Sequence, residues 1–119
     1  MNLYVSAINE IIEFIECNIN ERLQLKDLST RAGISDFHFN RIFKTVTGIT
    51  LKQYVLGRKL TKALELLRNT DKPVIEIAMD LGFDYPEVFS RAFKNQFGLS
   101  PTDIHNQKTD KWNKEGFHS

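Results

Sequence analysis

Two copies of one short motif carry the residues of this sequence best suited to chemistry. FNRIFK occupies residues 39–44 and FSRAFK occupies residues 89–94, with an arginine at the same place in both and Asn40 in the first. In the major groove of B-DNA, arginine can hold O6 and N7 of guanine, and asparagine can hold N6 and N7 of adenine. The repeat therefore points to double-stranded DNA as a partner.

The spacing within each copy predicts a helix with one apolar face and one polar face. Phe, Ile or Ala, and Phe lie at positions i, i+3 and i+4, and the next apolar residue is Val46 at i+7 in the first copy and Phe97 at i+8 in the second. A helical period places all of these residues on the inward face. The residues between them must then face outward: Asn40, Arg41, Lys44, Ser90, Arg91 and Lys94.

Each motif closes a larger module that also occurs twice. STRAGISD precedes the first copy and AMDLGFDY the second. A short helix, a turn containing glycine and a second helix with polar and basic outward residues form the helix-turn-helix pattern. The sequence therefore predicts two such units in one chain.

The remaining elements are also helical. An apolar stripe from Val5 to Ile19 predicts a first helix that leaves Cys17 on the polar face. Glycines are expected to end three helices: Gly33 ends LKDLSTRA, Gly48 ends DFHFNRIFKTV, and Gly82 ends the fifth helix. Helices are expected to begin at Ser35, at Thr50 for a long helix to about Asn69, at Pro73 for the fifth, and at Ser100 for a short seventh. For the sixth helix we expect a capping box of Asp84 and Glu87, with Pro86 in the first turn.

These elements predict an all-α, homeodomain-like fold of seven helices with a long linker helix between the two units. The expected segments are residues 5–49, 50–69 and 70–106, with 107–119 as a tail or linker in which Trp112 and Phe117 could anchor. A linker helix of about 19 residues measures roughly 28 Å. Two recognition helices near 34 Å apart could enter successive major grooves, so one chain could bind an asymmetric site as a monomer.

The charge distribution also favours an anionic partner. The net charge is +1, but residues 31–68 hold eight bases against two acids, or +6, whereas residues 1–30 total −3 and residues 69–119 total −2. A local excess of this size is typical of nucleic-acid binding.

Other function classes find little support. No run is long and apolar enough to cross a membrane, and the N-terminal residues lack the basic start of a signal peptide. A single cysteine fits a reducing compartment, so we expect a cytoplasmic protein. His38, His105 and His118 have no metal-ligand spacing, and no phosphate-binding glycine loop occurs, so we expect no enzyme, metal or cofactor.

A helical protein–protein interaction module is the alternative. Duplicated pairs of helices also occur in scaffold proteins, and an arginine and a lysine beside a buried stripe could simply extend to water. DNA affinity should fall steeply with salt, whereas an apolar protein interface should barely respond.

The run GFDYPEVFSRAFKNQFGLSP resembles the signature segment of AraC/XylS-type transcription regulators. The same family's DNA-binding domain is similar to the first half of the chain, LQLKDLSTRAGISDFHFNRIFKTVTGITLKQYVLGRKLTKALELL. The resemblance extends over about residues 5–106, and it is greatest to the MarA/SoxS/Rob branch of the family. It implies seven helices, monomeric binding to an asymmetric promoter element, and recruitment of RNA polymerase, usually for activation.

The resemblance also implies which residues contact DNA. Those expected to read bases are Phe37, Asn40, Arg41 and Lys44 in the first unit, and Pro86, Glu87, Ser90, Arg91 and Asn95 in the second. Those expected at the sugar-phosphate backbone are Ser35, His38, Thr50, Lys52 and Lys94.

Three departures from the branch lie outside the first recognition helix. Pro86 and Glu87 replace amides, Leu56 replaces a basic residue, and Ile104-His105 replaces Tyr-Arg. Glu87 could accept a hydrogen bond from cytosine N4 or serve as a helix cap, and the cap is favoured. The first unit is therefore expected to supply most of the DNA affinity.

Overall fold

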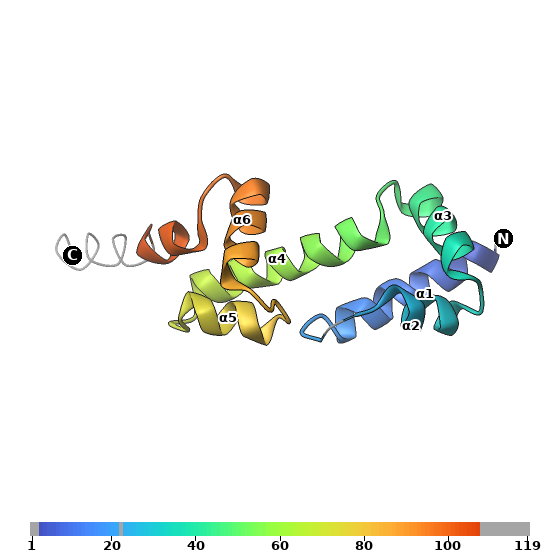
Figure 1. Ribbon diagram of the computed structural model, residues 1–119, viewed down its shortest axis with the longest axis horizontal. Coiled ribbons are helices and arrows are strands. Elements are labelled where there is room, and N and C mark those ends of the chain that lie inside the picture. The colour runs from blue at the N-terminus through green and yellow to red at the C-terminus, as the bar shows by residue number, and fades with distance from the viewer. Residues whose placement is uncertain (1–2, 22, 108–119) are drawn as a thin grey trace. The chain divides into compact units, whose positions relative to one another are not determined.

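The computed structural model describes residues 3–21 and 23–107, and within them it consists of helices, turns and loops without strands (Figure 1). The all-α fold with seven helices is confirmed. Six helices carry labels, and residues 101–107 form the seventh. The labelled helices are α1 (Leu3–Cys17), α2 (Leu25–Ala32), α3 (Asp36–Thr47), α4 (Leu51–Asn69), α5 (Val74–Asp80) and α6 (Pro86–Phe97).

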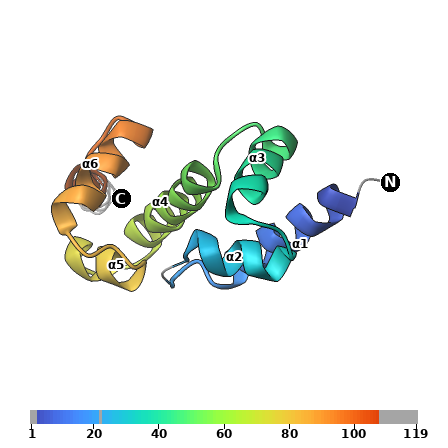
Figure 2. The ribbon, with the colours of Figure 1, turned by 45° about the vertical axis from the view of Figure 1, so that its right-hand side comes forward.

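The chain divides within α4 into two compact units, Met1–Lys59 and Leu60–Ser119. In each unit a short helix leads through a tight turn into a longer one, α2 into α3 and α5 into α6 (Figure 2). The two predicted helix-turn-helix units are therefore present. The expected tail anchors Trp112 and Phe117 lie outside the described residues.

The apolar stripe of α1 forms one side of the first unit's core. Burying such a stripe is the main source of helix stability, because a helix of this length is marginal alone in water. The stacked rings of Phe39 and Phe43 lie 6.0 Å apart, and Tyr54 meets Phe43 edge-on at 5.8 Å. Cys17 is exposed, as predicted. The buried core residues are Ile8, Ile11, Ile15, Leu28, Phe39, Ile42, Phe43 and Leu51.

The second unit buries the corresponding residues of its own motif. Phe89 and Phe93 are fully buried, and a chain of ring contacts runs from Phe83 through both to Phe97, with centroids 5.0, 5.8 and 4.7 Å apart. Such aromatic contacts add stability beyond the area they bury. The other buried apolar residues here include Leu60, Ala63, Leu67, Ile77, Ala78, Leu81 and Ile104.

The helix caps extend the fifty-residue repeat beyond the hexapeptide. Thr50 accepts a hydrogen bond from the N–H of Gln53 at 3.1 Å, and the Gln53 side chain accepts one from Thr50 N–H at 3.0 Å. Ser100 and Asp103 make the same reciprocal box before residues 101–107. Both boxes satisfy backbone donors that a helix start leaves unpaired, so these predicted caps are confirmed.

The expected start of α6 is wrong by one residue. Tyr85, not Asp84, is the N-cap, with φ −126° and ψ 119° and no side-chain hydrogen bond. The residue before a proline is forced into extended backbone, so Pro86 fixes the N-cap at Tyr85 and occupies the first helical position. Asp84 therefore lies one residue before the N-cap, and Glu87 does not stand at the third helical position that a capping box requires.

Two smaller expectations also change. Pro73 is the N-cap of α5 rather than part of its first turn, because the helix begins at Val74. Val46 is 37% exposed although its spacing placed it inward. It lies in the last turn of α3, whereas the ring that contacts Phe93 in α6 is that of Phe97, which corresponds to Thr47 in the repeat.

Candidate nucleic-acid interface

The turn of the first helix-turn-helix is closed by hydrogen bonds at both helix ends. Gly33 has φ 76°, a left-handed conformation that favours glycine, and its N–H bonds to the Ser29 and Thr30 carbonyls. Ser35 accepts from the N–H of His38 at 3.2 Å. The buried Ser29 hydroxyl donates to the Asp36 carboxylate and so joins α2 to the first turn of α3. Sequence reasoning missed this bond, although a serine on the inward face of α2 was a signal for it.

The turn of the second unit differs in length and bonding. Gly82, with φ 86°, is three residues before the N-cap Tyr85, whereas Gly33 is two residues before Ser35. Aligned on Gly33 and Gly82, Ser29 corresponds to Ala78, and aligned on the two N-caps, Asp36 corresponds to Pro86. Neither can reproduce the serine–aspartate bond, so the two recognition helices are tied to their supports differently.

The outward face of α3 gathers the residues predicted for base reading in the first unit. Phe37 is 74% exposed, and the Arg41 guanidinium lies 5.9 Å from the centre of its ring. Asn40 and Lys44 are exposed on the same helix. Among residues 3–21 and 23–107, no ion pair engages Arg41 or Lys44. These charges are therefore available to an external anion.

Three of the residues predicted to contact the DNA backbone lie beside this face. His38 is exposed and meets the ring of Tyr4 on α1 edge-on at 5.8 Å. Sequence reasoning did not single out Tyr4, which is 43% exposed. At the start of α4, Lys52 is exposed and Thr50 is half-buried by its capping box.

The outward face of α6 is less uniformly exposed. The exposed residues of this face are Glu87, Arg91, Lys94 and Asn95. The half-buried residues are Pro86 and Ser90. Glu87 lies in the first turn, where a carboxylate interacts favourably with the helix dipole. This face therefore carries two basic side chains together with one acidic residue.

Several bases of the +6 segment have partners within the first unit. The Arg31 guanidinium lies 3.9 Å from the centre of the Phe14 ring. Arg58 pairs with Glu16 at 2.7 Å, and Lys59 is only 8% exposed. The first-unit bases that remain exposed near the recognition helix are Arg41, Lys44 and Lys52. The segment's total charge thus overstates the charge facing DNA.

Lys59 joins α4 to the chain that follows α1. Its ammonium donates to the carbonyls of Ile19 at 2.7 Å and Glu21 at 2.8 Å. Burial lowers the pKa of this ammonium. Nearby, burial raises the pKa of Tyr54, and the Glu16 carboxylate that accepts its hydrogen bond adds to the rise. Both groups therefore act in packing α4 on α1.

Replacing Lys59 with methionine is expected to destabilise the protein by about 1–3 kcal/mol, because two partly buried carbonyls lose a charged donor. Chemical denaturation of both proteins measures the change in unfolding free energy. Lys62→Met is the matched control, since Lys62 is half exposed and makes only a 3.6 Å pair with Glu65. It should change stability by less than about 0.5 kcal/mol. Equal effects in the two variants would contradict the role given to Lys59.

Within the described residues, no helix is long and apolar enough to span a membrane. In the same residues no three histidine, cysteine or acidic side chains group as metal ligands would.

Two helix-turn-helix units with exposed basic and amide residues define a class of DNA-binding protein. A family model described as a helix-turn-helix domain matches residues 28–107, and the chain belongs to this AraC-type family. It is therefore a DNA-binding transcription regulator of the AraC type.

Individual relatives agree with this assignment. The chain is 37% identical to the transposon Tn10 TetD protein of Escherichia coli over 115 residues, 97% of this chain and 82% of that protein. It is 38% identical to the regulatory protein SoxS of Salmonella typhimurium over 96 residues, 81% and 90% of the two chains. The right origin-binding protein of Escherichia coli is 36% identical over 94 residues, but this alignment covers only 32% of that longer protein.

Solved structures show the same fold. The DNA-binding domain of AdpA, in a complex with a target DNA, superposes with a TM-score of 0.82 at 26% identity, over 87% of this chain and 94% of that one. An AraC-type regulator from Chromobacterium violaceum superposes with a TM-score of 0.79 at 29% identity, over 87% and 92% of the two chains.

Proposed function

We propose that one chain binds an asymmetric promoter site as a monomer, with α3 and α6 in successive major grooves. The observation that carries this proposal is the repeat itself. Both helices bury phenylalanines at matching positions, Phe39 with Phe43 and Phe89 with Phe93, and both expose an arginine between them. A symmetric dimer uses two chains to present two recognition helices. This chain carries two of its own.

Each residue of the two faces has a proposed role. In the first unit Asn40 and Arg41 read base edges with Lys44, and Phe37 contacts a thymine methyl or a sugar. Ser35, His38, Thr50 and Lys52 contact the backbone beside them. In the second unit Arg91 and Asn95 read bases with Ser90 and Pro86, Glu87 accepts from cytosine N4, and Lys94 contacts phosphate. The first unit supplies most of the affinity, because the acid in the first turn of α3, Asp36, accepts a hydrogen bond from Ser29, whereas the second face carries the exposed acid Glu87.

A binding selection tests the site directly. The protein is incubated with a random pool of 25-mer duplexes at moderate salt, and the bound fraction is sequenced. We expect two unlike blocks about one helical turn of DNA apart, in a complex whose mass corresponds to one chain per duplex. A palindromic motif or a two-chain complex would contradict monomeric binding. A single block would show that the second unit grips only the backbone.

Arg41→Ala is expected to weaken binding to the selected site by about 1–3 kcal/mol and to relax sequence preference at one base step. The physical reason is the loss of a bidentate contact from a side chain that no acid in the described part of the chain engages. Fluorescence anisotropy with the selected duplex measures the affinity, and a repeated selection measures the preference.

Arg91→Ala is the matched variant, because the two arginines occupy the same place in the repeat. We expect it to have the smaller effect, since the second face also holds Glu87. An unchanged sequence motif in the Arg41 variant would show that this residue does not read a base.

We further propose that the bound regulator contacts RNA polymerase and activates transcription. The observation that favours a protein contact is an exposed apolar pair one helical turn apart on α5, Ile75 at 57% and Met79 at 66% exposure. Transcription in vitro from a promoter that carries the selected site should rise when the protein is added. A fall would identify a repressor, and binding to polymerase without binding to DNA would favour a protein-interaction module.

A further inference from the structure

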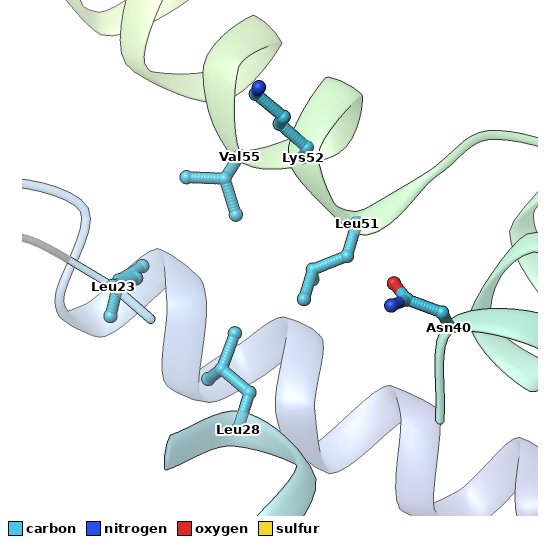
Figure 3. A pocket seen from close by; sticks show the side chains of 6 residues that line it. All are labelled: Leu23, Leu28, Asn40, Leu51, Lys52 and Val55. Carbon is cyan, nitrogen blue, oxygen red and sulfur yellow. The ribbon is translucent and has the colours of Figure 1, made fainter. Parts of the chain in front are cut away.

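A cavity of about 400 Å³ opens in the first unit among α2, α3 and the start of α4. Figure 3 shows Leu23, Leu28, Leu51 and Val55 turned toward a common space. Leu28 and Leu51 are buried, whereas Leu23 and Val55 are half-buried. The volume is within the range of small-molecule sites, which are mostly apolar with a few polar groups that orient the ligand.

Two polar residues complete the cavity, and neither is acidic. The amide of Asn40 points toward the space beside Leu51, and Lys52 starts at the rim and extends along α4 away from the floor (Figure 3). Both side chains are exposed, so solvent molecules and ions can reach them. Among the described residues that line the cavity, none carries a carboxylate. A ligand with an apolar body and an anionic head group matches this arrangement, because the ammonium attracts the charge and the amide can donate a hydrogen bond.

The second helix-turn-helix does not repeat this combination. Aligned on Gly33 and Gly82, Leu23 and Leu28 correspond to Lys72 and Ile77, and beyond the turn, at a spacing of fifty, Leu51 corresponds to Pro101. Asn40, Lys52 and Val55 correspond to Ser90, Thr102 and His105. The cationic and amide groups are thus absent from the corresponding positions, although the module folds in the same way. The helix-turn-helix architecture therefore does not require them.

We propose that this cavity binds a small amphipathic monocarboxylate and that the bound ligand competes with DNA. The competition rests on the proposed function, because Asn40 and Lys52 are also the residues assigned to a base and to the phosphate backbone. A carboxylate beside Lys52 takes the place of a phosphate, and the aliphatic chain occupies the space between the leucines. Reciprocal linkage requires DNA to weaken ligand binding by the same factor.

Octanoate and heptyltrimethylammonium form a matched pair of probes, with the same seven-carbon alkyl chain and head groups of opposite charge. Each is titrated into the full chain without DNA while the methyl resonances of leucine and valine are followed. We expect octanoate to shift the methyls of Leu28, Leu51 and Val55 saturably and to bind at least about tenfold more tightly than the cation. Lys52→Gln should weaken octanoate binding by about tenfold.

Two substitutions that fill the cavity with a larger side chain distinguish the effect on ligand binding from any effect on DNA binding. Val55→Phe should abolish octanoate binding and leave affinity for the selected duplex within about twofold. Leu23→Phe serves the same purpose if the Val55 variant fails to fold. At constant ionic strength, saturating octanoate should raise the Kd for DNA about fivefold or more in the parent protein and not in the filled variant.

Other results of these experiments would contradict the site, the competition with DNA or the proposed function, each in a distinguishable way. Equal binding of both probes, or cavity methyls that do not shift, would overturn the proposed site. Octanoate binding with no change in DNA affinity would overturn the competition. Failure of the parent protein to bind any duplex would overturn the proposed function instead, and the titration without DNA would still decide the cavity.

Discussion

Replacing Phe43 with alanine is expected to destabilise the protein by about 3–5 kcal/mol, and Phe93→Ala should have an effect of the same size. Both rings are fully buried, and each contacts further rings in its own unit. Truncation removes the ring's transfer free energy and leaves a cavity that a packed interior fills only in part. The two substitutions also lie at the same place in the repeat, so they compare the two cores directly.

Chemical denaturation followed by circular dichroism measures both effects. Phe37→Ala is the control, because the same change of side chain at a 74% exposed position should alter the unfolding free energy by less than about 0.5 kcal/mol. If Phe43→Ala and Phe93→Ala unfolded near the parent protein, the two rings would not support their cores as described.

Affinity for the selected duplex is expected to fall about a thousandfold between 50 and 200 mM salt. Roughly six phosphate contacts give a log–log slope of about −5, because each neutralised phosphate releases condensed counterions. We expect the exposed cations and the backbone N–H groups at helix starts, which also bind phosphate, to supply about six contacts. Anisotropy titrations at four or five salt concentrations measure the slope.

The exposure of each lysine predicts how its substitution changes the slope of the salt dependence. Lys52→Gln should make the slope shallower by about one, since Lys52 is exposed and is assigned to a phosphate. Lys59→Met should leave the slope unchanged, because its ammonium is committed to the carbonyls of Ile19 and Glu21. A flat salt dependence of the parent protein would favour the protein-interaction module over a DNA-binding regulator.

Most helix boundaries could be predicted because they depend on local chemistry. Gly33 and Gly48 end helices where left-handed backbone is needed, and Thr50 caps α4 with a residue three positions away. The start of α6 was mispredicted although its cause is also local, since the constraint that Pro86 imposes on Tyr85 outweighs the acidic pattern of Asp84 and Glu87.

The sequence by itself determined the two modules, their caps and their inward and outward faces, because periodicity and capping act within a few residues. Only the tertiary structure decided which charges remain available to a partner. Arg31 stacks on Phe14, Arg58 pairs with Glu16, and Lys59 bonds to a turn some forty residues earlier. Such contacts join segments far apart in the chain, so they depend on how α1 packs against α2 and α4. That packing leaves Arg41, Lys44 and Lys52 as the exposed cations at the first recognition helix.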